Sequence, residues 1–201
     1  MDNEFDFYYK YFNSNKQLAD NLIDLKLFDQ IRKAYETIID SLRGGHKLLI
    51  FGNGGSAAQA THFAAELVCK FEKNRHAIPA IALTTDTSVI TAQSNDLSFD
   101  SVFARQIEAL GQWGDVAIGL TTSDAEFSAP DVNFHSLNML QGFSTARAQK
   151  MHTVGLVSKK TKRLLILIDH PIIVPEENTA LIQNAHLAIL HFLCKAIEEN
   201  L

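Results

Sequence analysis

The sequence predicts an α/β domain in which a parallel sheet is covered by helices on both faces. Three observations support this fold class. Short apolar runs recur along the 201 residues, stretches with helical spacing separate them, and a glycine-rich turn follows the first run. Strands of a parallel sheet are buried on both faces, so they are nearly continuous apolar runs rather than alternating ones. The length fits one ordinary domain, or one domain with a helical extension.

The N-terminal segment has the spacing of a helix. Apolar positions recur at mostly three- to four-residue intervals through residues 16–43, and no glycine or proline interrupts them before Gly44 and Gly45. This pattern predicts one long amphipathic helix that ends at glycine. We therefore divide the chain into an N-terminal helical arm, residues 1–43, and an α/β domain, residues 44–201.

The strands follow in order along the second part. We expect them at 48–51, 80–83, 116–120 and 154–157, with 172–174 as a fifth candidate before Pro175. A last helix carries apolar residues on so much of its surface, from Leu181 to Leu193, that we expect it to be buried in the core or between subunits.

Composition excludes several classes of protein. The chain has 18 Lys and Arg against 23 Asp and Glu, a net charge of -5, and lacks the clustered positive surface of a nucleic-acid binder. Cys69 and Cys194 are isolated, which excludes a disulfide framework or thiolate metal site and favours a reducing cytoplasm. The acidic N-terminus is unlike a secretory signal, and no apolar stretch approaches the roughly 20 residues that span a bilayer, so we expect no membrane association.

A glycine-rich loop, Gly52-Asn53-Gly54-Gly55-Ser56, links the first strand to a helical stretch that runs through Phe71. Such a loop exposes backbone N–H groups at the positive end of a helix, which together bind an anion such as phosphate. It has neither the P-loop nor the dinucleotide-binding spacing. A tight turn that binds nothing is the alternative, although three glycines in four positions exceed what a turn requires.

Three hydroxyl residues, Thr121, Thr122 and Ser123, end the third strand. Ligands of doubly wound sheets lie outside the carboxyl ends of the strands, so these hydroxyls and Ser56 could meet one sugar phosphate. Local capping of the next segment by the same hydroxyls is the alternative, and by itself the better one.

Two pairs of polar residues have helical spacing. His62 and Glu66 are four residues apart, and Gln183 and His191 are eight apart on one broad face of the last helix. The pairs could bind a divalent metal, or serve as a carboxylate base and an imidazole acid. Local helix contacts and core histidines, His186 among them, are the alternative, and spacing alone favours it.

These segments together resemble the sugar-isomerase (SIS) domain and, within it, the phosphoheptose isomerases. The resemblance includes the glycine loop, His62-Phe63-Ala64-Ala65-Glu66, Ala80 to Ser88, Thr121-Thr122-Ser123 and the last helix, and covers nearly the whole chain. It implies a SIS-type, doubly wound sheet of five parallel strands. It also implies isomerisation of sedoheptulose 7-phosphate to D-glycero-D-manno-heptose 7-phosphate for lipopolysaccharide heptose, by a cytoplasmic homotetramer with zinc at subunit boundaries.

The resemblance also assigns roles to residues. Glu66 would be the base and His191 the partner acid/base of an enediol mechanism. Zinc would be bound by His62, Glu66, Gln183 and His191. The substrate would be bound by Asn53, Gly54, Gly55, Ser56, Glu66, Asn95, Asp96, Thr121, Thr122, Ser123, Ser136 and Gln183.

The chain departs from the family pattern after the third strand. A ten-residue insertion, residues 124–133, precedes Ser136 and adds three acidic residues near the expected phosphate site, which a basic run at 159–163 could offset. Lys70 stands where the family has arginine, and Leu181 where it has another. We predict that deleting 124–133 alters substrate affinity more than stability.

Two non-catalytic functions remain as alternatives. The chain also resembles a SIS-fold regulator that binds the bacterial replication initiator, through Asn53, Ser56-Ala57-Ala58 and Leu83-Thr84-Thr85-Asp86. A module that senses a sugar phosphate without converting it is the other. A non-catalytic protein would be free to lose Glu66 and His191, and both are present.

Overall fold

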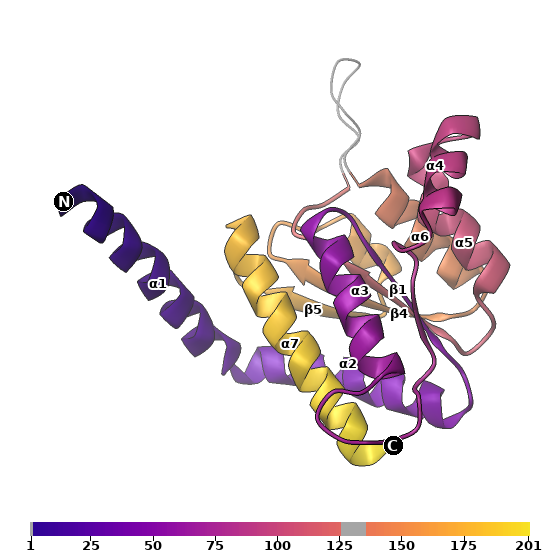
Figure 1. Ribbon diagram of the computed structural model, residues 1–201, viewed down its shortest axis with the longest axis horizontal. Coiled ribbons are helices and arrows are strands. Elements are labelled where there is room, and N and C mark those ends of the chain that lie inside the picture. Colours follow the sequence, from indigo (N-terminus) through magenta and orange to yellow (C-terminus); the bar gives the residue numbers. More distant parts are fainter. Residues whose placement is uncertain (1, 126–135) are drawn as a thin grey trace.

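A five-stranded, all-parallel sheet forms the centre of the protein (Figure 1). The computed structural model describes residues 2–125 and 136–201. The strands are β1 (Leu48–Gly52), β2 (Ala80–Ala82), β3 (Val116–Leu120), β4 (His152–Ser158) and β5 (His170–Val174). Their order is β2-β1-β3-β4-β5, so the chain winds outward from β1 in both directions. The predicted fold class is confirmed.

The direction of winding reverses between β1 and β3, which pair in parallel from Leu48 opposite Val116 to Gly52 opposite Leu120. Every residue of these two strands is buried, as their continuous apolar runs predict. A reversal of this kind leaves a crevice at the carboxyl ends of the two strands, where ligands of doubly wound folds bind. The glycine loop and the three hydroxyl residues both begin at this point.

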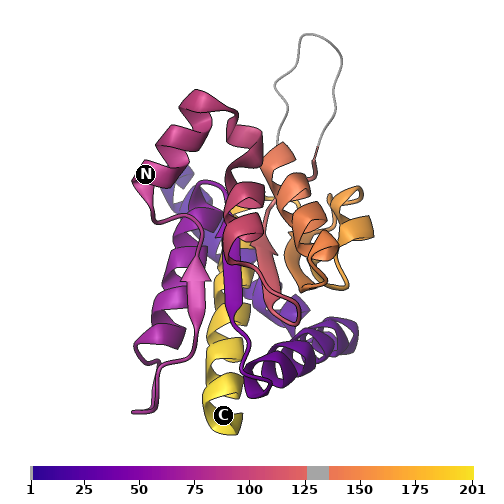
Figure 2. The same cartoon turned by 90° about the vertical axis from the view of Figure 1, so that its right-hand side faces the viewer.

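Helices cover both faces of the sheet (Figure 2). Alternate residues of β1 point to opposite sides: Leu48 and Ile50 join one core cluster, and Leu49 and Phe51 join the other. The first cluster is covered by α2 (Leu25–Arg43), α3 (Gly55–Val68) and α7 (Thr179–Asn200). The second is covered by α5 (Val102–Leu110), α6 (Leu137–Ala148) and the 3-10 turn η2 (Leu164–Leu167). A short helix α4 (Thr87–Asp96) and the turn η1 (Phe99–Ser101) precede α5.

The single helix expected at 16–43 is wrong, because the chain forms two helices there, α1 (Asp2–Leu22) and α2. The break lies at Ile23 and Asp24. The Asp24 carboxylate accepts the N–H groups of Lys26 and Leu27 at 2.7 and 3.3 Å, so it caps the start of α2. An aspartate that satisfies these amides favours a new helix start over continuation. The glycine end is confirmed, with the Gly44 amide bonded to Asp40 O and Gly45 at a φ of 80°.

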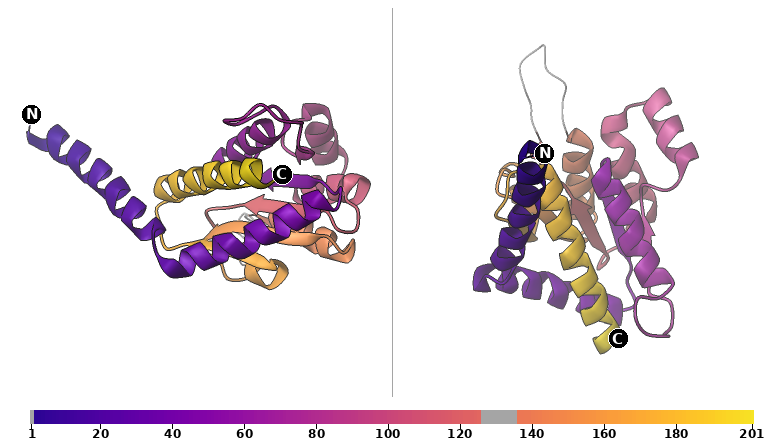
Figure 3. Two further views of the ribbon diagram at one scale, coloured as in Figure 1. Left: turned by 90° about the horizontal axis from the view of Figure 1, so that it is seen from below. Right: turned by 60° about the vertical axis from the view of Figure 1, so that its left-hand side comes forward.

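The two N-terminal helices have different environments (Figure 3). α2 packs along β5 and buries Ala34 and Ile38 completely. α1 extends away from the rest of the chain, and its contacts are with α7, where Asn184 Nδ2 donates to Asn15 Oδ1 at 2.7 Å. Its exposed aromatic residues are Phe5, Phe7, Tyr8, Tyr9, Tyr11 and Phe12.

We expected no apolar stretch near the length that spans a bilayer, but the last helix, α7, contains one. Its 22 residues are enough to cross a bilayer by length and composition alone. Half of this stretch is buried inside the protein, where Ala185, Leu190 and Leu193 pack in the core shared with α2, α3 and the sheet. This burial is typical of the core helix of a globular domain.

Candidate functional site

Three glycines shape the glycine loop, and a side chain at each would be opposed for a different reason. A side chain at Gly52 would meet Leu120 O at 2.8 Å, because the loop passes close to β3. Gly54 has a φ of 55° and a ψ of -121°, a backbone conformation that glycine alone adopts readily. A Cβ at Gly55 would lie 2.4 Å from Gln183 Nε2 on α7. The loop therefore needs its glycines for close approach as well as for turning.

The loop opens directly onto the N-terminus of α3. The amides of Ser56 and Ala57 donate to the carbonyl of Asn53 at 2.9 and 3.3 Å. Because these two amides already have a partner, an anion would be bound by the amides of Gly54 and Gly55. The positive end of the α3 dipole adds to this attraction. Gly54 and Gly55 are exposed, whereas Ser56 is only 3% exposed. An anion can thus reach the loop, with Ser56 at its base.

A pair of side-chain amides, one of them buried, fixes the loop to α6. Asn53 Nδ2 donates to Asn138 Oδ1 at 2.9 Å, and Asn138 Nδ2 donates to Asn53 Oδ1 at 2.8 Å. Asn138 is 2% exposed, and its oxygen also accepts the N–H of Met139. Asn138 was not among the site residues predicted from the sequence. Its signal in the sequence was a polar amide in the first turn of an apolar helix, two residues after Ser136.

The hydroxyl residues after β3 are partly used within their own loop. Thr121 Oγ1 donates to Ser123 O at 3.1 Å and lies 3.2 Å from the Ser123 N–H. This is the local turn that the alternative reading proposed. The next strand secures the same loop, since Ser158 donates to Thr122 O and Thr161 donates to Ser123 O.

Ser136 joins these hydroxyls despite the insertion between them. Ser123 Oγ and Ser136 Oγ are 3.4 Å apart, and Ser136 stands directly before α6 in the left-handed conformation with a φ of 63°. The fold therefore brings the glycine loop, the end of β3 and the start of α6 to one edge of the sheet. Asn53, Thr122, Ser123 and Ser136 are partly exposed there.

The two histidines of the predicted pairs face each other between α3 and α7. His62 Nε2 and His191 Nε2 are 2.9 Å apart, and His62 Nε2 is 3.7 Å from Glu66 Oε1. Glu66 is partly exposed, so its carboxylate is open to solvent on one side. Two facing imidazole nitrogens and one carboxylate suit either proton transfer or a zinc ion. His62, Glu66 and His191 are thus brought together within one chain.

Gln183 lies at the opposite end of the α3–α7 contact. It precedes His191 by eight residues, a separation of about 12 Å along a helix. Its side chain lies against Gly55, and its carbonyl accepts Gln59 Nε2 at 2.7 Å. Over residues 2–125 and 136–201, no group of three His, Cys, Asp or Glu side chains is arranged to hold a metal. One chain therefore does not assemble the four expected zinc ligands.

Asn95 and Asp96 are the last two residues of α4. Both are exposed, and Asn95 Nδ2 donates to Asp96 Oδ1 at 2.8 Å. No residue of α4 is buried. Within one chain these two side chains bind each other rather than the glycine loop.

The first residue of the insertion is anchored to the basic run. The Asp124 carboxylate accepts the N–H groups of Lys162, Arg163 and Leu164 at 2.9 to 3.2 Å. Ala125 is completely buried. Asp124 therefore neutralises backbone dipoles instead of facing a phosphate. Glu126 and Asp131, with most of the insertion, lie outside the described residues.

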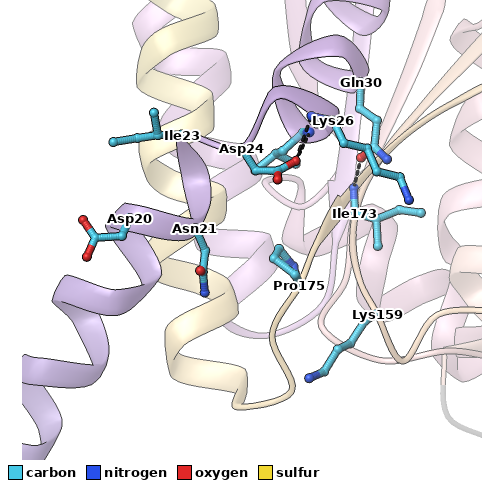
Figure 4. Close-up of a pocket in the computed structure, with 10 residues that line it drawn as sticks. Asp20, Asn21, Ile23, Asp24, Lys26, Gln30, Lys159, Ile173 and Pro175 are labelled. Atoms are coloured by element: carbon cyan, nitrogen blue, oxygen red, sulfur yellow. Dashed lines mark hydrogen bonds between the residues drawn. The ribbon is translucent and has the colours of Figure 1, made fainter.

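Two hollows of substantial size lie away from this chemistry. One, of about 670 Å³, lies between the α1–α2 elbow and β5 and is lined by Asp24, Gln30 and Ile173 among others, with Gln30 Oε1 accepting the Ile173 N–H at 2.8 Å (Figure 4). The other, of about 710 Å³, lies beside the edge strand β2. Neither is lined by the glycine loop or by Glu66, so the chemistry of the residues identifies the site better than the size of a hollow.

The remaining titratable candidates belong to the core. His186 is completely buried, burial lowers its pKa to about 4, and its Nε2 lies 3.4 Å from Val157 O. Cys69 and Cys194 are free thiols, as expected. Burial raises the pKa of Cys194 to about 12, with Glu66 and Glu198 adding to the shift. His186 is thus the core histidine that its apolar helix predicts.

Comparisons with known proteins show which family the chain resembles. Residues 10–158 match the SIS domain family. The phosphoheptose isomerase of Geobacter sulfurreducens is 41% identical over 179 residues, 89% of either chain, and that of Campylobacter jejuni is 46% identical over 171 residues, 85% of this chain and 87% of the other. The solved phosphoheptose isomerase of Neisseria gonorrhoeae is 32% identical with a TM-score of 0.86, covering 96% of this chain and 98% of the other.

The fold alone extends to regulators. The sugar isomerase domain of an RpiR transcription factor from Sphaerobacter thermophilus has a TM-score of 0.55 at 14% identity, covering 94% of this chain and 87% of that one. Such a similarity concerns the fold and not the function.

Proposed function

The chain belongs to the phosphoheptose isomerase family of SIS-domain proteins, and we propose that it converts sedoheptulose 7-phosphate into D-glycero-D-manno-heptose 7-phosphate for lipopolysaccharide heptose. The observation that carries this proposal is the meeting of Glu66 with the facing imidazoles of His62 and His191. The same helix, α3, begins at a glycine loop suited to a phosphate.

Isomerisation of a ketose to an aldose requires two kinds of proton transfer. Glu66 removes a proton from C1 of the ketose and returns it to C2, and His191 moves the proton between the oxygens of C1 and C2, through an enediol. The glycine loop holds the phosphate at the far end of the sugar, aided by the hydroxyls of Thr122, Ser123 and Ser136. Positive net charge is unnecessary for this, because backbone N–H groups and hydroxyls bind the phosphate.

Zinc is part of the proposal, and the donor set supports it. His62, Glu66 and His191 offer two imidazole nitrogens and a carboxylate, which are ligand types that zinc prefers, and His62 Nε2 lies 2.9 Å from His191 Nε2 and 3.7 Å from Glu66 Oε1. When bound, the ion would polarise the substrate carbonyl and stabilise the developing negative charge. Gln183 would have to come from another copy, since within its own chain it lies beside Gly55.

We further propose that the protein is a cytoplasmic homotetramer, with neither nucleic acid nor membrane as a partner. Two apolar surfaces support assembly. The exposed aromatic side chains of α1 form one, and a hollow of about 230 Å³ lined by Leu22, Phe28, Ile31, Ala188, Ile189 and Phe192 is the other. Exposed apolar patches of this kind mark protein interfaces. Sedimentation of the purified protein tests the assembly, and a monomer contradicts it.

The decisive experiment follows sedoheptulose 7-phosphate by NMR in deuterated water, with zinc supplied. We expect heptose 7-phosphate to accumulate and solvent deuterium to enter at C2. Glu66→Gln should reduce the rate at least about 100-fold, the usual contribution of a positioned base. Glu72→Gln is the matched control, because Glu72 is over half exposed and pairs with Lys195. Absence of turnover in the wild type, with Glu66→Gln indistinguishable from it, contradicts the enzyme proposal and favours a sensor.

A further inference from the structure

A buried carboxylate outside the expected site binds the loop that follows α3. Glu198, near the end of α7, accepts the N–H groups of Phe71, Glu72 and Lys73 at 2.8, 2.9 and 3.1 Å, and Arg75 Nε donates to it at 3.0 Å. Its side chain is 1% exposed. Burial would raise the pKa of Glu198, but the three N–H groups and Arg75 lower it, so the carboxylate is ionised. Four donors thus fix the loop to α7.

Arg75 binds the end of the helix that carries Glu66. Its Nη2 donates to Glu66 O at 2.7 Å, and its Nη1 donates to Leu67 O at 2.7 Å. The last carbonyls of a helix have no partner within the helix, and α3 has no glycine cap, since Cys69 occupies that position. Arg75 is 13% exposed and links these carbonyls to Glu198. The ion pair therefore fixes the last turn of α3.

Phe71 transmits this attachment to His191. Its ring lies against the imidazole of His191 with centroids 5.6 Å apart and an interplanar angle of 23°. The ring of His62 also contacts His191, with centroids 5.2 Å apart and an interplanar angle of 71°. The backbone of Phe71 is held by Glu198, so one carboxylate fixes the residue that packs on His191 and, through Arg75, the turn that contains Glu66.

Stability alone does not account for a buried ion pair at this position. Two surface pairs already join the same loop to the same helix, Lys195 with Glu72 at 3.0 Å and Lys73 with Glu199. Exposed pairs contribute little, and a buried pair costs desolvation that apolar packing would avoid. A fully bonded buried network does, however, hold its members in one geometry.

We propose that Glu198, Arg75 and Phe71 are positioning residues that hold the imidazole of His191 and the last turn of α3 in the geometry that proton transfer needs. This inference rests on the proposed roles of Glu66 and His191. None of the three touches the reacting atoms, so each acts through its neighbour.

Phe71→Leu and Phe71→Tyr test the ring. Leucine keeps apolar contact but has no flat face, and we expect it to lower kcat about tenfold or more, since small displacements of catalytic groups have large effects on rate. KM should change less than about threefold, because the phosphate is bound at the other end of α3. Tyrosine should restore at least half of the lost kcat. Equal kcat values for Phe71→Leu and the wild type overturn the proposal.

Glu198→Gln tests the carboxylate, with Glu72→Gln as the control on the same loop. We expect Glu198→Gln to reproduce the kcat loss of Phe71→Leu and the control to retain wild-type kcat. An NMR spectrum of the His191 imidazole, recorded without zinc or substrate, gives a readout apart from activity. It should show one conformation in the wild type and Glu72→Gln, and broadened or shifted signals in Glu198→Gln, which leaves the Phe71 ring in place.

The two readouts separate this inference from the proposed function. If the wild type has no isomerase activity, the proposed function fails, and an altered His191 spectrum in Glu198→Gln still supports the positioning network. An unaltered spectrum overturns the network whatever the activity. If tyrosine does not restore kcat, and the melting temperatures of both Phe71 variants fall as well, the role of Phe71 is merely structural. That result also overturns the positioning network.

Discussion

Replacing Gly55 by alanine separates the geometry of the glycine loop from the stability of the fold. The added Cβ would lie 2.4 Å from Gln183 Nε2 and 2.9 Å from its Cδ and Oε1. Ordinary contact begins at 3.4 Å, so the end of the Gln183 side chain must withdraw by about 1 Å. The atoms that move belong to the tip of a flexible side chain. We therefore expect the fold to persist with Gln183 displaced from the loop.

The expected magnitudes follow from this geometry. Moving a side chain off its preferred rotamer costs about 0.5–1.5 kcal/mol. For a chain of this size each kcal/mol corresponds to about 2–4 °C, so the melting temperature should fall by at most about 6 °C. Isomerase activity should fall more than about tenfold, because Gln183 is a proposed ligand of substrate and metal and catalysis depends on its position.

Thermal melting and the NMR isomerase assay provide the two measurements. Gly54→Ala is the contrasting variant, since its Cβ would meet nothing within 4 Å and only the φ of 55° opposes it, at about 1–3 kcal/mol. Gly55→Ala combined with Gln183→Ala removes the clash, so stability should recover while activity stays low. Unchanged activity in Gly55→Ala, or a loss of stability that the second substitution does not relieve, refutes the reasoning.

Three further predictions follow. Asp124→Ala should lower the free energy of unfolding by about 0.5–2 kcal/mol in urea titrations, because three amides lose their cap, with Asp124→Asn losing less. Asn138→Ala should cost about 1–3 kcal/mol in the same assay and raise KM, because Asn53 loses its buried amide partner. His186 has its pKa lowered from 6.5 to about 4, so unfolded chains bind the extra proton between these values and stability should fall by roughly 3 kcal/mol from pH 6.5 to 4. His186→Leu should flatten that pH dependence of unfolding.

The expected effect of deleting 124–133 also changes once the structure is considered. Asp124 and Ala125 are structural, since one caps a turn and the other is buried. Deletion of the full segment therefore removes an anchor as well as a loop. A variant that lacks only 126–133 tests the expected change in substrate affinity more cleanly.

The parallel sheet was predictable because its strands are buried on both faces. Every residue of β1 and β3 is buried, so each strand is a continuous apolar run in the sequence. β4 and β5 begin two residues before their predicted starts, at His152 and His170. Backbone pairing extends a strand into polar residues at its end, and an apolar pattern in the sequence does not reveal that extension.

The break at Asp24 illustrates the limit of periodicity. The apolar positions before and after it fit one helix, yet the carboxylate satisfies the amides of a second helix start, and the two helices take different directions. The hydrophobic spacing reports which residues are buried in each helix. It carries little information on a change in axis between them.

The sequence by itself determined the strands, the glycine loop and the helical pair of His62 with Glu66, because each depends on neighbours a few residues away. Only the tertiary structure decided which of these features meet. It brought His191 to His62 across 129 residues, Asn138 to Asn53 across 85, and Asp124 to the turn at 162–164, while placing Gln183 two helical turns from His191. These contacts depend on how helices pack across the sheet, and no local pattern encodes that packing.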